Sequence, residues 1–85
     1  MGLQTTFHAP FGGAFLGWRK NRSGSTEIVY DSGSQTRIVW RVAGSMESES
    51  GLVEALSVAV NASRVLPSLY GELKKRAIAI EQIAD

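Results

Sequence analysis

The sequence contains no cysteine and only one histidine, His8. Without cysteine there are no disulfides and no cysteine-ligated zinc, and one imidazole cannot build a histidine-rich metal site. We therefore expect no metal and no other cofactor. No apolar run approaches the roughly 18–20 residues that span a bilayer. The first ten residues also lack the basic and apolar regions of a secretory signal, so we expect a cytoplasmic protein without membrane contact.

The chain is also short, at 85 residues, which is the length of one domain. A chain of this size buries only about 60–65% of the surface that its unfolded form exposes. Small domains of this kind are commonly stabilised by disulfides, metals or self-association. Because the first two are excluded, we predict a homo-oligomer.

The first half of the chain has the pattern of β-strands. Glycine and serine clusters separate runs that are rich in β-branched and aromatic residues. The connections are short, so neighbouring strands are expected to be antiparallel. The sequence therefore predicts a β-meander of three to four strands within residues 3–43, with strands at residues 3–8, 14–20, 26–31 and 36–42.

Alternation within these strands predicts which face is buried. The face that helices would cover is predicted to consist of Leu16, Trp18, Ile28, Tyr30, Ile38, Trp40 and Val42. Glu27 and Val29 are predicted to lie outside, together with a row of basic residues made of Arg19, Arg37 and Arg41.

The second half has helical periodicity after a polar linker at residues 44–50, in which Ser48 and Ser50 are candidate N-caps. Pro67 interrupts the pattern, and proline either ends a helix, kinks it or occupies the first turn of the next one. We expect two helices within residues 51–84, or one helix kinked at Pro67, with the second helix over residues 68–84. The fold class is thus α+β, in a single domain of residues 1–85.

The expected second helix carries apolar residues over a wide arc, because Ile78 and Ile83 cannot both lie on the stripe that contains Leu73. Surplus apolar surface of this kind is typical of a helix with a partner. We therefore predict that the homo-oligomer forms through the C-terminal helices.

No catalytic arrangement is evident in the sequence. A serine nucleophile needs a positioned base, and His8 lies in a segment flanked by proline and glycine. No acidic pair is placed for acid–base chemistry, and no phosphate-binding glycine motif is present. We predict a binding protein that is not an enzyme.

Aromatic residues beside cations supply chemistry for binding. Trp18-Arg19 and Trp40-Arg41 repeat one pattern on two strands, and such pairs can hold a planar or phosphorylated ligand. The candidate ligand-binding residues are Trp18, Arg19, Tyr30, Arg37, Trp40, Arg41 and Arg64. The alternative is an ordinary solvated face above two core tryptophans. Lys74, Lys75 and Arg76 likewise form either a solvated helix face or a contact for phosphate or an acidic protein.

Residues 59–69, Ala-Val-Asn-Ala-Ser-Arg-Val-Leu-Pro-Ser-Leu, followed by Glu72-Leu73, resemble a pattern of small bacteriophage accessory proteins. In those proteins a β-meander precedes an alanine-rich helix, a proline and a leucine- and glutamate-rich helix. The resemblance implies counter-defence, either by a sponge that sequesters a nucleotide immune signal, as anti-Thoeris and anti-CBASS proteins do, or by a protein inhibitor of the anti-CRISPR kind.

Three functions are accordingly expected, in order of preference. The first is sequestration of an anionic cyclic nucleotide or ADP-ribose-type molecule. The second is inhibition of a host defence protein by direct binding, and the third is self-association alone. The net charge of +1 gives no reason to expect a nucleic-acid partner.

Overall fold

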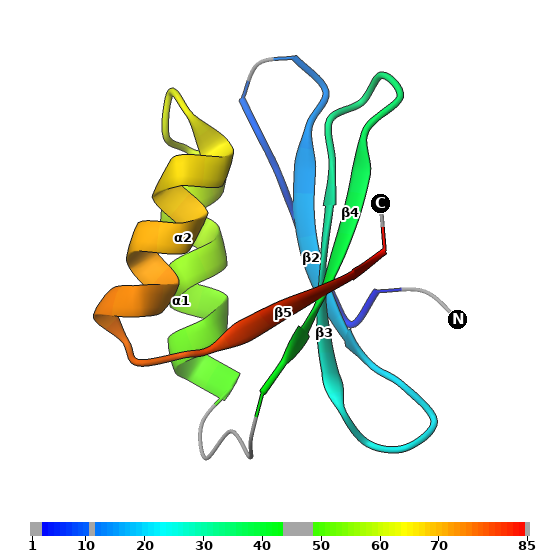
Figure 1. Ribbon diagram of the computed structural model, residues 1–85. Coiled ribbons are helices and arrows are strands. Elements are labelled where there is room, and N and C mark those ends of the chain that lie inside the picture. The colour runs from blue at the N-terminus through cyan, green and yellow to red at the C-terminus, as the bar shows by residue number, and fades with distance from the viewer. Residues whose placement is uncertain (1–2, 11, 44–48, 85) are drawn as a thin grey trace.

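The computed structural model describes residues 3–10, 12–43 and 49–84. Four strands come first and are followed by two helices and a fifth strand (Figure 1). The elements are β1 (Thr5–His8), β2 (Phe15–Lys20), β3 (Thr26–Asp31), β4 (Arg37–Val42), α1 (Glu49–Val60), α2 (Val65–Lys75) and β5 (Ile80–Ala84). The predicted α+β class is confirmed, and the structure has one strand more than the prediction.

The strands form one antiparallel sheet in the order β1-β2-β3-β4-β5. Local turn chemistry holds the hairpin between β2 and β3, where the Asn21 side-chain oxygen accepts hydrogen bonds from the backbone N–H groups of Ser23 and Ser25, both at 3.0 Å. The turn between β3 and β4 lies against the turn between β1 and β2. A side chain at Gly33 would come within 2.7 Å of the Gly13 carbonyl oxygen, so this close approach requires glycine.

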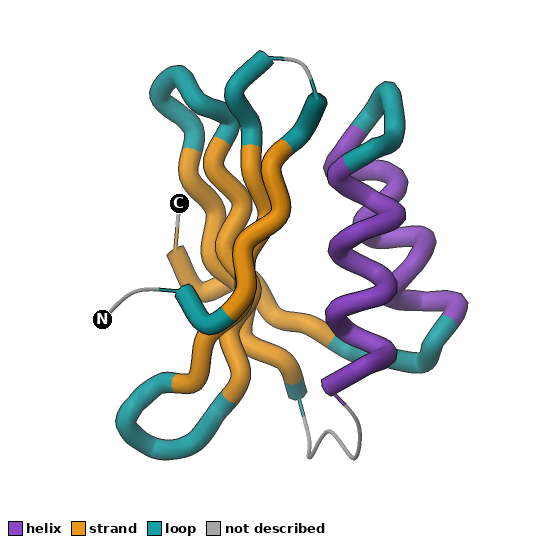
Figure 2. The backbone as a smooth tube through the Cα atoms, turned by 180° about the vertical axis from the view of Figure 1, so that it is seen from behind, coloured by secondary structure: helices purple, strands orange, loops and turns teal. Residues whose placement is uncertain are grey.

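The two helices pack side by side on one face of the sheet and make a two-layer molecule (Figure 2). We call this the helix face of the sheet and the opposite side its outer face. The helix face brings Leu16, Trp18, Ile28, Trp40 and Val42 into one core with the apolar side of the helices. Tyr30 and Ile38 are half-buried against this core, so the predicted buried face is confirmed.

Two side chains on the outer face are less exposed to solvent than the alternation of the sequence predicts. Glu27 and Val29 do lie on that face, because the register pairs Val29 with Gly17 and Val39 rather than with core residues. Even so, Val29 is fully buried and Glu27 is only 9% exposed. Leu3 lies over Gly17 in the same row of the sheet, so the N-terminal segment covers part of the outer face.

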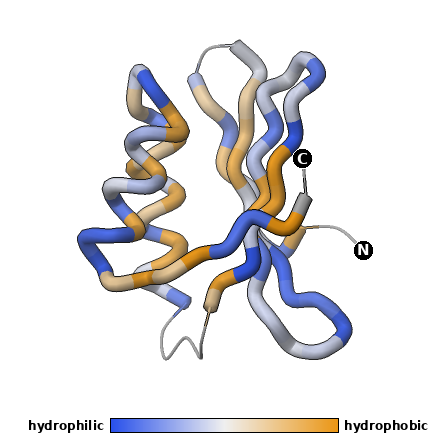
Figure 3. Tube along the Cα trace, viewed as in Figure 1, coloured by the Kyte–Doolittle hydropathy of each residue, from blue (hydrophilic) through white to orange (hydrophobic). Residues whose placement is uncertain are grey.

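The prediction of a second helix over residues 68–84 is wrong. The α2 helix ends at Lys75, and residues 80–84 form β5, which pairs with β4. The free edge of β4 supplies the physical reason, because backbone hydrogen bonds to a strand compete with continuation of the helix. In Figure 3, β5 is apolar at both ends and polar in its middle, so it lacks the strict alternation of a half-buried strand.

The chain breaks between the helices. Residues 61–64 separate α1 from α2, Arg64 is the N-cap of α2, and Pro67 lies in the first turn of α2. Pro67 therefore begins a second helix and does not kink a single one. Ser50 lies inside α1 and is not its N-cap, while Ser48 lies outside the described residues.

The apolar surplus that suggested helix pairing has another explanation. Ile78 and Ile80 pack against the core of the same chain, because the segment after α2 turns back to the sheet. Ile83 belongs to β5 and is 40% exposed. The homo-oligomer through the C-terminal helices stays a prediction, but the apolar residues at positions 78 and 80 no longer support it.

Candidate functional site

Charged side chains on the outer face form a ladder across four strands. The register places Arg19, Glu27, Arg41 and Glu81 side by side on β2, β3, β4 and β5. Arg19 Nε donates to Glu27 Oε1 at 2.9 Å, and Arg41 lies 3.4 Å from Glu81 Oε1. Because acids and bases alternate, the ladder carries no net charge. It is a weak candidate for an anion site.

Glu27 is the best-connected member of the ladder. Its second carboxylate oxygen accepts a hydrogen bond from the Asn21 amide at 3.2 Å. Burial alone would raise the pKa of Glu27. The hydrogen bonds from Arg19 and Asn21, with the charges of Arg19 and Arg41, outweigh burial, so the pKa of Glu27 lies below its usual value.

The structure distributes the predicted ligand-binding residues over three places. Trp18, Tyr30 and Trp40 lie on the helix face, where the two tryptophans are 3% and 2% exposed. Arg19, Arg37 and Arg41 lie on the outer face, and Arg64 lies in the connection between the helices. The sheet separates the aromatic residues from the three outer-face arginines, so these residues do not line one common cavity.

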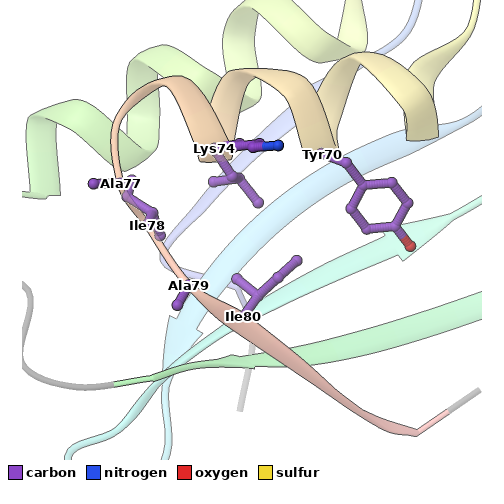
Figure 4. Close-up of a pocket in the computed structure, with 7 residues that line it drawn as sticks. Tyr70, Lys74, Ala77, Ile78, Ala79 and Ile80 are labelled. Atoms are coloured by element: carbon purple, nitrogen blue, oxygen red, sulfur yellow. The ribbon is translucent and has the colours of Figure 1, made fainter.

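A groove between α2 and β5 is the strongest candidate site, because a cation lies on its mainly apolar wall. Its volume is about 380 Å³, within the range of ligand-binding clefts. Tyr70 and Lys74 extend from α2, and Ile80 points from β5 toward the helix (Figure 4). The lining is mainly apolar and consists of Tyr70, Leu73, Lys74, Ala77, Ile78, Ala79 and Ile80.

Lys74 is the cation of this groove. Its neighbour Lys75 pairs with Glu72 at 3.2 Å, and Arg76 bridges Glu72 at 2.7 Å and Glu54 of α1 at 2.8 Å. The Lys74 ammonium group makes no hydrogen bond or ion pair with the residues that the structure describes. The three consecutive cations thus divide into two with structural ion pairs and one whose ammonium group is available to a ligand.

The end of α2 shapes the groove. The Ala77 N–H donates to the Lys74 carbonyl at 3.0 Å, and the Ile78 N–H donates to the Leu73 carbonyl at 2.9 Å. These two bonds make a Schellman motif, and Ala77 occupies its left-handed position with φ of 57°. The motif reverses the chain toward the sheet and brings Ile78 and Ile80 beneath Tyr70 and Leu73.

Comparisons with protein families, curated proteins and solved structures found no match to this chain.

A second cavity, of about 320 Å³, lies between the β1–β2 turn and the connection of the helices. Small apolar residues such as Ala9, Ala14 and Val60 dominate its lining. Its nearest amide, that of Asn61, already donates to the Ser57 carbonyl at 2.8 Å. Its other polar side chain, that of Ser63, is uncharged, so this cavity lacks the cation that the α2–β5 groove offers to a ligand.

The groove is far from the one imidazole. His8 is exposed on the outer face of β1, where its ring lies 6.0 Å from that of Phe15.

Within residues 3–10, 12–43 and 49–84, no three His, Cys, Asp or Glu side chains gather as a metal site would need. In the same part of the chain, no helix has the length and apolarity to cross a membrane.

Sequence reasoning did not find the groove. The helix predicted over residues 68–84 contains Tyr70, Lys74 and Ile80, and on such a helix residues 70 and 80 cannot face each other across a cleft. The sequence carries no strand signal here, because Ile80-Glu81-Gln82-Ile83 does not alternate and its polar residues favour a helix. The helical periodicity that precedes this segment therefore extends through it.

Proposed function

We propose that this chain is a non-enzymatic binding protein whose α2–β5 groove docks a segment of a partner protein. The observation that carries this proposal is the groove itself: a mainly apolar cleft, open to solvent, with the uncompensated ammonium of Lys74 beside it. Tyr70 adds an aromatic ring that is 44% exposed. Aromatic anchors at an apolar cleft are typical of protein-binding surfaces, and a charge at the rim of such a cleft contributes specificity.

Charge complementarity defines the partner. An apolar side chain of the partner would fill the space between Leu73 and Ile80, and an acidic side chain would pair with Lys74. Inhibition of a host defence protein, expected from the resemblance to phage accessory proteins, is one use of such a surface. The counter-defence setting and the cytoplasmic location remain predictions.

A phage-displayed library of random seven-residue peptides tests the proposal. Immobilised wild-type protein should enrich peptides that contain an apolar and an acidic residue. Synthetic versions should bind Lys74→Ala about two- to fivefold more weakly, which corresponds to one exposed charge pair. Lys75→Ala is the matched control, because it removes the same charge one residue away from the groove. Absence of enrichment, or equal losses in both variants, would contradict the proposal.

A small anionic molecule is the second candidate, favoured by the combination of Lys74 with the Tyr70 ring in a cleft of about 380 Å³. One cation suits one anionic group, so a cyclic dinucleotide would need cations from a second copy. Thermal unfolding against cyclic dinucleotides, cyclic trinucleotides and cyclic ADP-ribose isomers distinguishes the two. A ligand at 100 times its dissociation constant raises stability by about 2.7 kcal/mol. A shift of this size that Lys74→Ala abolishes would replace the protein partner with a nucleotide.

A further inference from the structure

At Ile80, strand β5 pairs with no described strand on the side away from β4. It is the last strand of the sheet and pairs with β4 on one side, through partners that include Val42 opposite Ile80. Just before β5, the Ala43 N–H donates to the Ala79 carbonyl at 2.9 Å. Consecutive residues of a strand direct their backbone groups to opposite edges. The backbone N–H and C=O of Ile80 therefore point away from β4, toward the free edge.

The groove and this edge meet at Ile80. The Ile80 side chain lines the groove from below, while Tyr70 and Lys74 line it from α2 above (Figure 4). A further strand would lie about 4.7–4.9 Å from β5 in the plane of the sheet. On the helix face, the side chain of that strand opposite Ile80 would then enter the groove beneath α2.

We propose, on the basis of the function proposed above, that the partner segment binds in extended form and adds to β5 as a sixth strand at Ile80. Backbone hydrogen bonds to the N–H and C=O of Ile80 hold it, and one apolar side chain fills the groove. The residue two positions along faces the same side, about 7 Å away. There an acidic side chain pairs with Lys74.

Two features of β5 define how far this pairing extends. The register between β4 and β5 shifts at Val39 and Trp40, which marks a bulge near the end of β5. Bulges at sheet edges interrupt further pairing, so the added strand is short and centred on Ile80. On the outer face, the exposed carboxylate of Glu81 disfavours an acidic residue in the partner.

The test uses peptides enriched from the phage-displayed library, resynthesised with single N-methyl groups along the backbone. N-methylation removes one donor, so the amides that face Ile80 should lose about tenfold in affinity, the equivalent of about 1.4 kcal/mol. Methylation of the alternate amides, which point away from β5, is the matched control and should change affinity less than about threefold. Enriched sequences should place the apolar and acidic residues two positions apart.

The outcomes separate this inference from the proposed function. Equal tolerance of N-methylation at all positions, with Lys74→Ala still weakening binding, would overturn strand addition and retain the groove as the docking site. Enrichment of peptides with apolar residues at helical spacing would have the same meaning. A lack of any enriched peptide would overturn both proposals. In the bound state, the Ile80 amide should also exchange its hydrogen at least about tenfold more slowly than in the free protein.

Discussion

The rings of Trp40 and Tyr70 meet edge to face, with their centroids 5.9 Å apart and their planes at 89°. Trp40 belongs to the buried centre of the sheet, whereas Tyr70 belongs to α2 and lines the groove. The pair therefore links the core to the candidate site, and it fixes the position of α2 over β4.

Tyr70→Ala should destabilise the protein by about 1–2 kcal/mol, because an aromatic pair contributes about 0.5–1.5 kcal/mol beyond its buried area. Chemical denaturation measures this change. Val58→Ala is a suitable control, since Val58 is also a helical residue that is 44% exposed. It should change stability by no more than about 0.5 kcal/mol. Equal effects of the two substitutions would show that the ring contact contributes nothing.

Ala77→Gly should stabilise the protein. At this left-handed position, alanine costs roughly 1–2 kcal/mol relative to its preferred conformations, and glycine avoids most of that cost. Part of the gain is offset by the greater freedom of glycine in the unfolded chain. The net expectation is about 0.5–1 kcal/mol, or an increase in melting temperature of about 2–8 °C.

The control for this prediction is Ala79→Gly, two residues further along and without a positive φ. There glycine brings no conformational relief, and stability should fall by about 0.4–1 kcal/mol. If Ala77→Gly lowered the melting temperature as Ala79→Gly does, the left-handed conformation at residue 77 would be in doubt.

The predictability of the fold differs between its two halves. For β2, β3 and β4, glycine and serine turns bound the strands and alternation defines the faces, so local signals and the final structure agree. The helix end at Lys75 has no such signal, because alanine occupies the position where glycine usually marks a helix end. Strand β5 forms only because β4, some 40 residues earlier, offers an edge. The groove lies between α2 and β5 and was therefore unpredictable as well.

The candidate ligand residues illustrate a second limit. The tryptophan–arginine pairs on β2 and β4 suggested a joint site, but adjacent strand residues face opposite sides of a sheet. The sequence of a single strand does not reveal its register with its neighbours. In the structure, Arg19 lies opposite Glu27, and Arg41 lies between Glu27 and Glu81. The charge of the arginine row is compensated by acids on the neighbouring strands, and sequence composition alone could not show this.

Lowering the pH should reduce the free energy of unfolding, because Glu27 becomes protonated. The pKa of Glu27 is lowered in the folded state from an ordinary value of 4.5. Its contribution to stability is therefore complete above pH 4.5 and is lost as the pH falls through the folded pKa. Glu72 acts in the same direction, because hydrogen bonds from Arg76 and Lys75 lower its pKa.

Glu27→Gln should cost about 1 kcal/mol near neutral pH and reduce the loss of stability as the pH falls below 4.5. Denaturant titrations at several pH values measure both effects. Glu49→Gln is the control, since Glu49 is exposed and its ion-pair partner Lys20 lies 3.7 Å away. A pH profile that Glu27→Gln leaves unchanged would remove Glu27 from the acid response.

Gly17 is needed where Leu3 crosses the outer face of β2. A β-carbon at residue 17 would lie 2.6 Å from Leu3 Cδ1 and 3.0 Å from the Thr5 carbonyl oxygen. Gly17→Ala should therefore cost about 1–3 kcal/mol, the usual cost of overpacking. In a Leu3→Ala background the closer of the two contacts is gone, and only the backbone contact remains. The cost of Gly17→Ala should then fall by at least about 0.5 kcal/mol, which a double-mutant cycle detects. Strict additivity of the two substitutions would mean that Leu3 does not lie over Gly17, and that other side chains bury Val29.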